Sequence, residues 1–194
     1  MFRDLVLRNR SYRRFREERR VRIAVLRELT DLARICPSGA NLQPLRYVLV
    51  ADREVNARVF PCLSWAGYLA DWPGPEEGER PAAYIAILHD RSVKESGPGH
   101  DAGIAAQTIL LGAADRGLGG CMIGSIDRER LRGVLDLDPG LDVVLVLALG
   151  EPVEQVVLED LDGDGDIRYW RDESGLHHVP KRLLSRLVAR EFGD

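Results

Sequence analysis

The stretch "ARICPSGANLQPLRYVLV", residues 33–50, joins a predicted helix to a predicted strand through a loop without charge. Apolar residues at helical spacing run through 21–35, and Pro37 ends that helix because a residue before proline avoids the α region. The run "RYVLVA", 46–51, is typical of a buried strand. Between them, residues 37–44 carry Ser, Asn and Gln between two prolines, which favours binding of a planar ligand with polar edges.

The rest of the chain alternates helical patterns with a few buried strands. Further helices are predicted at 53–60, 101–117, 128–135 and around residues 183–188, with Asp127 as the cap of the third. Further buried strands are predicted at 82–88 and 143–150. The pattern favours an α/β or α+β class layered on one sheet, with residues 1–194 forming a single domain.

Two segments depart from this alternation. Residues 61–81 are rich in Gly, Pro and Trp and lack periodicity, which predicts a long surface loop of the kind that forms a lid. The glycine-rich "LGGCMIG", 118–124, predicts a turn and a sheet edge. Its glycines suit either a close approach of the backbone to a flat ligand or a cap for the preceding helix.

Composition excludes several classes of partner. The net charge of −4 gives no bulk attraction to nucleic acid or to an anionic membrane. The apolar runs are too short to cross a bilayer, and no signal peptide opens the chain. Three widely spaced cysteines without a CxxC motif support neither a disulfide framework nor a zinc site, so we expect a cytoplasmic protein with free thiols.

Three motifs that resemble known sites lack a required part. The acidic run from Asp160 matches an EF-hand loop until its twelfth position, where Arg171 replaces the bidentate carboxylate; we therefore predict an acidic hairpin turn. His177 and His178 would point to opposite faces of a strand, which favours structural histidines and no metal site. The "GLGG" run from Gly117 follows a helix and lacks the third glycine of a dinucleotide-binding loop.

Three polar clusters remain: "NRSYRRF" at 9–15, the loop 37–44 and "VPKR" at 179–182. Residues 1–34 contain 11 Arg against 5 acidic residues, which suits either a solvated helix face or part of a phosphate site. Arg and Ser beside a helix terminus make a good phosphate clamp. Each cluster alone is equally compatible with a capping or turn role, but together they fit one ligand.

At these residues the sequence resembles the nitroreductase family of FMN-dependent oxidoreductases. The resemblance is carried by "RSYRRF" at 10–15, "ARICPSGANLQPLRYVLV" at 33–50, "AAQTILLGAADRGLGGCMIGSI" at 105–126 and "VLALGEP" at 146–152. It implies an α+β nitroreductase-like fold in which helices cover a central mixed β-sheet, as a three-layer sandwich. It also implies a homodimer with FMN at the subunit interface, where the loop 37–44 reaches the flavin of the other subunit.

The resemblance also implies a set of cofactor-binding residues: Arg10, Ser11, Arg13, Arg14, Pro37, Ser38, Gly39, Asn41, Gly119, Gly120, Met122, Lys181 and Arg182. Arg13 and Arg14 are alternatives for the cation beside flavin N1 and O2, which would favour reduction. Gly119, Gly120 and Met122 are expected over the isoalloxazine ring. The aromatic residues of the 61–81 segment, Trp65, Tyr68 and Trp72, are either a platform for the acceptor or local packing.

The implied activity is transfer of a hydride from NAD(P)H through FMN to a small acceptor such as a nitroaromatic or a quinone. The chemistry is the flavin's, so no side chain is expected to act as catalytic acid or base. One alternative is a specialised flavin enzyme of the same fold that performs dehalogenation, flavin destruction or dehydrogenation. Another is a flavin-binding protein without turnover.

Overall fold

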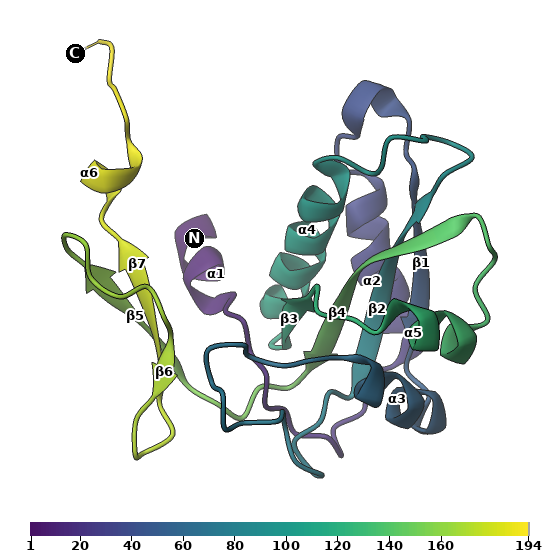
Figure 1. The fold of residues 1–194 in the computed structure, drawn as a ribbon, viewed down its shortest axis with the longest axis horizontal. Helices are drawn as coiled ribbons and strands as arrows, with labels where there is room; N and C mark the ends of the chain where they lie inside the picture. The colour runs from purple at the N-terminus through teal and green to yellow at the C-terminus, as the bar shows by residue number, and fades with distance from the viewer. Residues whose placement is uncertain (194) are drawn as a thin grey trace. The chain divides into compact units, whose positions relative to one another are not determined.

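The computed structural model describes residues 1–193, and the chain forms two compact units (Figure 1). The first unit contains residues 1–65 and 73–153, and the second contains residues 66–72 with 154–193. Each unit has its own β-sheet. The single domain expected from the sequence stays a prediction.

The first unit is built on a four-stranded sheet in the order β1-β2-β4-β3. Its strands are β1 (Leu45–Val50), β2 (Ala83–Asp90), β4 (Leu141–Gly150) and β3 (Gly119–Ile123). All three pairings are antiparallel, and the mixed pairing expected of the sheet occurs instead in the second unit. The apolar runs predicted as strands are confirmed, because β2 and β4 lie in the sheet centre, where nearly all of β2 and the second half of β4 are buried.

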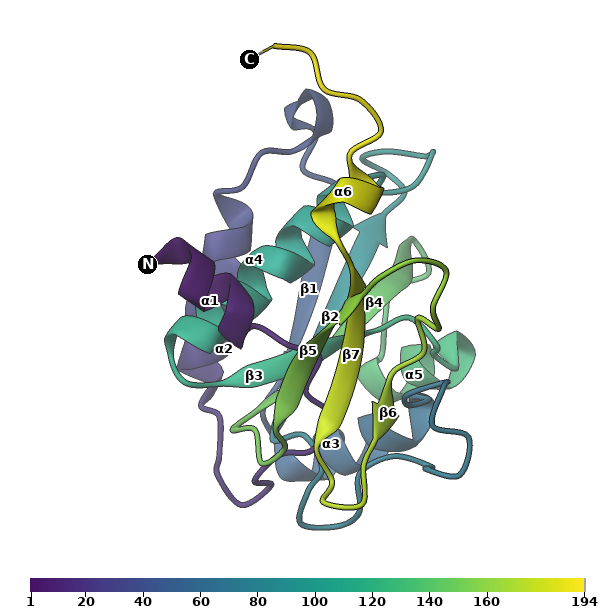
Figure 2. The ribbon, with the colours of Figure 1, turned by 90° about the vertical axis from the view of Figure 1, so that its left-hand side faces the viewer.

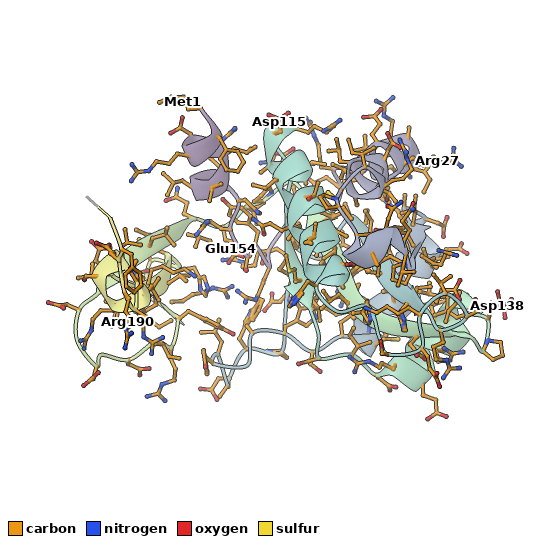
Figure 3. The ribbon with its side chains drawn as sticks, turned by 90° about the horizontal axis from the view of Figure 1, so that it is seen from above. Met1, Arg27, Asp115, Asp138, Glu154 and Arg190 are labelled. Carbon is orange, nitrogen blue, oxygen red and sulfur yellow. The ribbon has the colours of Figure 1, made fainter. Side chains whose placement is uncertain are left out.

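Helices α2 (Ile23–Arg34) and α4 (Asp101–Asp115) cover one face of this sheet and lie side by side, as Figure 3 shows with Arg27 and Asp115 labelled. Their close approach depends on Gly112. A Cβ there would lie 2.5 Å from Leu32 Cδ1. The apolar side chains of both helices pack on those of β2 and β4, including Leu26, Leu29, Ile109, Ile85, Ile87, Leu147 and Leu149. This core fixes α4 as a rigid element.

Helices α3 (Arg53–Val59) and α5 (Arg128–Leu135) pack together in front of the sheet in Figure 1. Asp52 caps α3 by accepting hydrogen bonds from the N–H groups of Glu54 and Val55. Asp127 caps α5 through the Arg130 N–H, as the sequence predicted. With helices on both faces of the sheet, the α+β class and the three layers are confirmed.

The N-terminal segment passes from α1 (Phe2–Arg8) along the end of the sheet. Ser11 forms an isolated parallel bridge with Gly120, and Phe15 forms an antiparallel bridge with Pro152. Phe15 is fully buried. These contacts attach the arginine-rich start of the chain to β3 and to the end of β4.

Residues 61–81 differ from the surface loop that the sequence predicted. After the short helix η2 (Phe60–Cys62), the side chains of Cys62, Leu63 and Trp65 are buried. Leu63 bridges Ile126. Apolar side chains at this end of the segment therefore fill the core of the first unit, whereas residues 66–72 belong to the second unit.

The second unit contains β5 (Val156–Leu161), β6 (Trp170–Arg171) and β7 (His177–Arg182) in the order β5-β7-β6. Strand β7 pairs in parallel with β5 and antiparallel with β6. The acidic turn therefore does not close the predicted hairpin, because the strands on either side of it both pair with β7. The predicted C-terminal helix is reduced to the single turn α6 (Leu184–Leu187), whose residues are exposed.

Candidate functional site

Two polar clusters of the first unit lie at opposite ends of α4 (Figures 1 and 2). One is the arginine segment, residues 10–14, which pairs with the first residues of β3. The other is the polar loop, residues 37–44, which contains the short helix η1 (Gly39–Asn41). Helix α4 has 15 residues, so about 22 Å of helix axis separates its two ends.

The arginine segment is attached to β3 through its backbone. The N–H of Tyr12 donates to the carbonyl of Gly120 over 3.1 Å, next to the bridge between Ser11 and Gly120. Two motifs that are more than a hundred residues apart in the sequence thus form one local structure. Predicted cofactor residues from both motifs, Ser11 and Gly120, are brought together.

Arg10 is a half-buried cation with an unsatisfied donor. Its Nη2 donates to the carbonyl of Val6 over 2.6 Å, while its buried Nε has no hydrogen-bond partner within residues 1–193. Burial lowers the pKa of this guanidinium, against a smaller opposite effect of Tyr12. A desolvated cation with an unused N–H gains from an anion that supplies both charge and a hydrogen-bond acceptor.

The structure distinguishes the two arginines that the sequence left as alternatives. Arg14 forms a bidentate ion pair with Glu79, with both N–O distances at 2.6 Å. Arg13 is bound within its own segment, where Nη1 donates to the carbonyl of Ser11 over 3.2 Å. Arg14 therefore takes part in an architectural contact, and which of the two arginines meets the flavin stays a prediction.

Glycine is needed at two positions of β3 because the chain itself packs closely there, a reason that the sequence did not suggest. A Cβ on Gly119 would lie 2.5 Å from both Pro152 Cγ and Tyr12 Cδ2. A Cβ on Gly120 would lie 2.9 Å from Leu110 Cδ2. Packing within the chain is thus enough to require glycine at both positions, and a role of Gly119 and Gly120 at the flavin stays a prediction. Met122 differs from both, because it is 39% exposed on the same strand.

The polar loop is bound to the start of α4 by Asp101. The hydroxyl of Ser38 donates to Asp101 Oδ2 over 2.5 Å, and the N–H of Gly39 donates to Oδ1 over 3.0 Å. Ser38 Oγ in turn accepts the N–H of Gln43 over 2.9 Å. Sequence reasoning missed Asp101, whose only signal is an acidic residue at the start of the strongest helix.

Asp101 is an ionised group in a buried position. Burial by itself would raise the pKa of this carboxyl, but the hydrogen bonds from Ser38 and Gly39, with Lys94 and His100 nearby, outweigh it and lower the pKa. Burial, together with Cys36 and Asp101, raises the pKa of the neighbouring Tyr47 to about 12. A stable carboxylate therefore anchors the polar loop.

The exposed end of the polar loop has unusual backbone geometry. The φ angles of Ala40, Asn41 and Gln43 are 49°, 55° and 54°, a left-handed region that side chains rarely adopt. Gln43 Nε2 donates to the carbonyl of Asn41 over 3.1 Å. The exposed Asn41 amide makes no side-chain hydrogen bond within residues 1–193, so it is available to a ligand.

The predicted acceptor platform is divided. Trp65 is buried beside Phe60, with 5.7 Å between ring centroids, and a Cβ on Gly74 would lie 2.6 Å from its Cδ1. Local packing is therefore the correct interpretation for Trp65. Tyr68 and Trp72 belong to the second unit, where Tyr68 packs on Tyr169 and Trp72 packs under Arg171.

The remaining predicted cofactor residues also lie outside the first unit. Lys181 and Arg182 are exposed residues at the end of β7. Their role stays a prediction from the resemblance. Within residues 1–193, no group of three or more His, Cys, Asp or Glu side chains is arranged so that it could hold a metal ion, the acidic run from Asp160 included. None of the helices in that range has the length and apolar content to span a membrane.

Comparisons with known proteins agree with this fold. A model of the nitroreductase family matches residues 6–151. A protein of Methanothermobacter thermautotrophicus, provisionally named NADH dehydrogenase/NAD(P)H nitroreductase, is 28% identical over 159 residues, which cover 78% of each chain.

Two solved structures share the fold. An FMN-dependent nitroreductase from Clostridium difficile superposes with a TM-score of 0.65 at 22% identity, over 78% of this chain and 87% of its own. An enone reductase of gut-bacterial fatty acid saturation gives a TM-score of 0.66 at 19% identity, over 78% and 89% of the two chains. Because the family model covers more than half of the sequence, the chain belongs to the nitroreductase family.

Proposed function

We propose that this chain is an FMN-dependent oxidoreductase that acts as a homodimer. It takes reducing equivalents from NAD(P)H and delivers them to a small acceptor such as a nitroaromatic or a quinone. The main support is Arg10, whose half-buried guanidinium keeps an unused donor beside Ser11 and Arg13. That donor set fits the phosphate and the polar ring edge of a flavin mononucleotide.

The separation of the two polar clusters supports a site made by two chains. Arg13 and Asn41 are both assigned to the flavin, yet their segments lie at opposite ends of α4, with about 22 Å of helix between them. The isoalloxazine ring is much shorter than that helix. A flavin that meets both segments therefore takes the arginine segment from one chain and the polar loop from another.

The redox chemistry is that of the bound flavin, and the chain's residues bind and orient it. Arg10 and Ser11 supply donors for the phosphate, while Arg13 places positive charge beside the pyrimidine edge, where it favours reduction. Asn41 offers both a donor and an acceptor to the ring from the other chain. No described contact assigns an acid or base to the reaction.

The purified protein tests this proposal directly. Its absorbance spectrum should be that of a flavoprotein, either as isolated or after reconstitution with FMN. Anaerobic titration with NADH and then NADPH should bleach the flavin bands, and addition of an acceptor should restore them. A colourless protein that takes up no FMN on reconstitution would contradict the proposal.

Identification of the acceptor requires a comparison of several compounds, because an enone reductase shares this fold. A nitroaromatic, a quinone and an α,β-unsaturated ketone should be compared at equal concentrations under anaerobic conditions. Faster re-oxidation by the ketone than by the other two would favour a specialised reductase. Re-oxidation by none of the three, despite full FMN occupancy, would favour a flavin-binding protein without turnover.

A further inference from the structure

We propose that Asp101 is a positioning residue, which holds the polar loop in the conformation that presents Asn41 to the flavin. Ser38, on this proposal, acts through Asp101 and is not itself a donor to the cofactor. The inference rests on the proposed function, because it assigns roles within the same flavin site. It also divides the predicted residues of the loop into those that hold the loop in place and those that contact the flavin.

The hydroxyl of Ser38 is already used inside the chain. A serine hydroxyl has one proton, and that proton points to Asp101 Oδ2 over 2.5 Å. Its oxygen accepts the N–H of Gln43 over 2.9 Å. Ser38 therefore has no donor left for a carbonyl or ring nitrogen of the flavin, and it joins both ends of the loop to one carboxylate.

Asp101 is well placed to serve as an anchor. It is 8% exposed, and both of its oxygens accept hydrogen bonds from the loop: Oδ2 from Ser38, and Oδ1 from the Gly39 N–H over 3.0 Å. An ionised carboxylate makes stronger hydrogen bonds than a neutral acceptor. Because α4 is fixed in the core, the loop is attached to a rigid part of the first unit.

The loop needs such an anchor because its backbone is strained. Ala40, Asn41 and Gln43 all have positive φ angles, and such residues keep this conformation only when surrounding contacts impose it. The contacts in question are those of Asp101 with Ser38 and Gly39. Removal of the carboxylate should let the three residues relax and move the exposed Asn41 amide away from its presented position.

The first measurement uses the flavin-free protein. Amide hydrogen exchange at Gly39 and Gln43 should accelerate about tenfold or more in Asp101→Ala, the change that loss of a charge-assisted hydrogen bond produces. Asp101→Asn keeps an acceptor for Gly39 and should give an intermediate rate. Asp52→Ala is the matched control, since Asp52 also accepts backbone N–H groups at a helix start but caps α3. Unchanged exchange in Asp101→Ala would overturn the inference.

The second measurement is FMN titration of the same variants, with Ser38→Ala and the Ser38→Ala/Asp101→Ala pair added. Asp101→Ala and Ser38→Ala should each bind FMN about tenfold more weakly, whereas Asp52→Ala should bind it like the wild-type chain. The pair should be no weaker than Asp101→Ala, because both residues act through one hydrogen bond. Additive losses would show that Ser38 contacts the flavin itself and overturn its assignment. Wild-type affinity in Asp101→Ala would overturn the positioning role while leaving the proposed function intact. If the wild-type chain bound no FMN, the proposed function would fail, and the exchange rates would still decide whether Asp101 holds the loop.

Discussion

Arg14 and Glu79 form a bidentate ion pair in which Nε lies 2.6 Å from Oε2 and Nη2 lies 2.6 Å from Oε1. Each side chain is about one-third exposed. The neighbouring Phe15 N–H donates to the carbonyl of Glu79 over 2.9 Å, so the pair strengthens a backbone contact between two distant segments. One arginine of the segment thus supports the architecture, whereas the proposed function assigns its neighbour Arg13 to the flavin.

Substitution of these two arginines should separate stability from cofactor binding. Arg14→Ala should lower the free energy of unfolding of the flavin-free protein by about 1 kcal/mol, because the pair is bidentate but partly exposed. Arg13→Ala should weaken FMN binding about tenfold, because the proposed function assigns its guanidinium to the flavin, and it should lower the free energy of unfolding less than Arg14→Ala does. Denaturant unfolding and FMN titration of both variants measure the two effects. If Arg13→Ala lowered stability and Arg14→Ala weakened FMN binding instead, the two arginines would have the opposite roles.

Two glycines, Gly120 in β3 and Gly124 just after it, test whether close packing requires glycine in this strand. Gly120→Ala should destabilise the first unit by about 3 kcal/mol, because the new methyl group would meet Leu110 and the backbone of Ala148 in a filled core. Gly124→Ala is the control, since the nearest atom to its new methyl group would be Leu145 Cδ2 at 3.8 Å. Thermal unfolding of the flavin-free variants measures both. Equal stability of the two variants would contradict the packing explanation.

Arg171 should be essential to the second unit. Its Nη2 lies 2.9 Å from Oε2 of Glu154, whose side chain is 1% exposed, and its guanidinium lies 4.3 Å from the ring centroid of Trp72. Arg171→Ala leaves a buried carboxylate without this cation and should destabilise the unit by about 3 kcal/mol. Limited proteolysis should then cleave within residues 66–72 and 154–193.

The control for that prediction is Arg168→Ala. Arg168 also forms an ion pair, with Asp166 over 2.7 Å, but both side chains are largely exposed. Its loss should therefore change stability by less than about 1 kcal/mol. Similar protease sensitivity of the two variants would mean that burial of Glu154 has no special energetic role.

His178 predicts how the stability of the second unit depends on pH. The hydrogen bond with Glu159, at 2.6 Å from Nδ1, and then Asp172 raise the pKa of His178 above its ordinary 6.5, although burial opposes them. A raised pKa in the folded state stabilises the fold fully below the unfolded pKa, and this contribution is lost as pH rises through the folded pKa. The unfolding midpoint should therefore fall as pH increases from about 6.5.

The matched variant for this titration is His178→Gln, which keeps a polar side chain on β7 but does not titrate. Its unfolding midpoint should lack the fall above about pH 6.5. Thermal unfolding monitored at the fluorescence of Trp170, which stacks on His178 with ring centroids 4.7 Å apart, reports on this unit. A midpoint that rises through neutral pH in the wild-type protein would contradict the assignment.

Local patterns in the sequence predicted most of the first unit. The apolar spacing of α2, the apolar runs of β2 and β4, and the cap of Asp127 on α5 are all decided by residues close together in the chain. The α+β class followed from these elements. Element boundaries in the structure differ from the predicted ones by a few residues at most, as expected where helix and strand ends depend on tertiary contacts.

The parts that sequence reasoning missed depend on distant residues. The bond between Ser38 and Asp101 joins positions 63 apart, and the space beside Gly119 is filled by Tyr12 and Pro152. The second sheet was missed because its parallel pair, β5 with β7, encloses the acidic turn and the two-residue strand β6. None of the residues of α6 is buried in the described part of the chain, and a helix of one turn is marginal without packing.

The central claim is that one flavin takes the arginine segment from one chain and the polar loop from another. It is tested most directly with a heterodimer of Arg10→Ala and Asn41→Ala chains, co-expressed with two different tags and purified through both. If two chains share each site, one site of this heterodimer carries both substitutions and the other carries neither. We predict about one tightly bound FMN per heterodimer, with neither variant homodimer retaining the cofactor. A heterodimer that retains no FMN, like the two homodimers, would mean that both segments serve the flavin of their own chain, and would contradict the account.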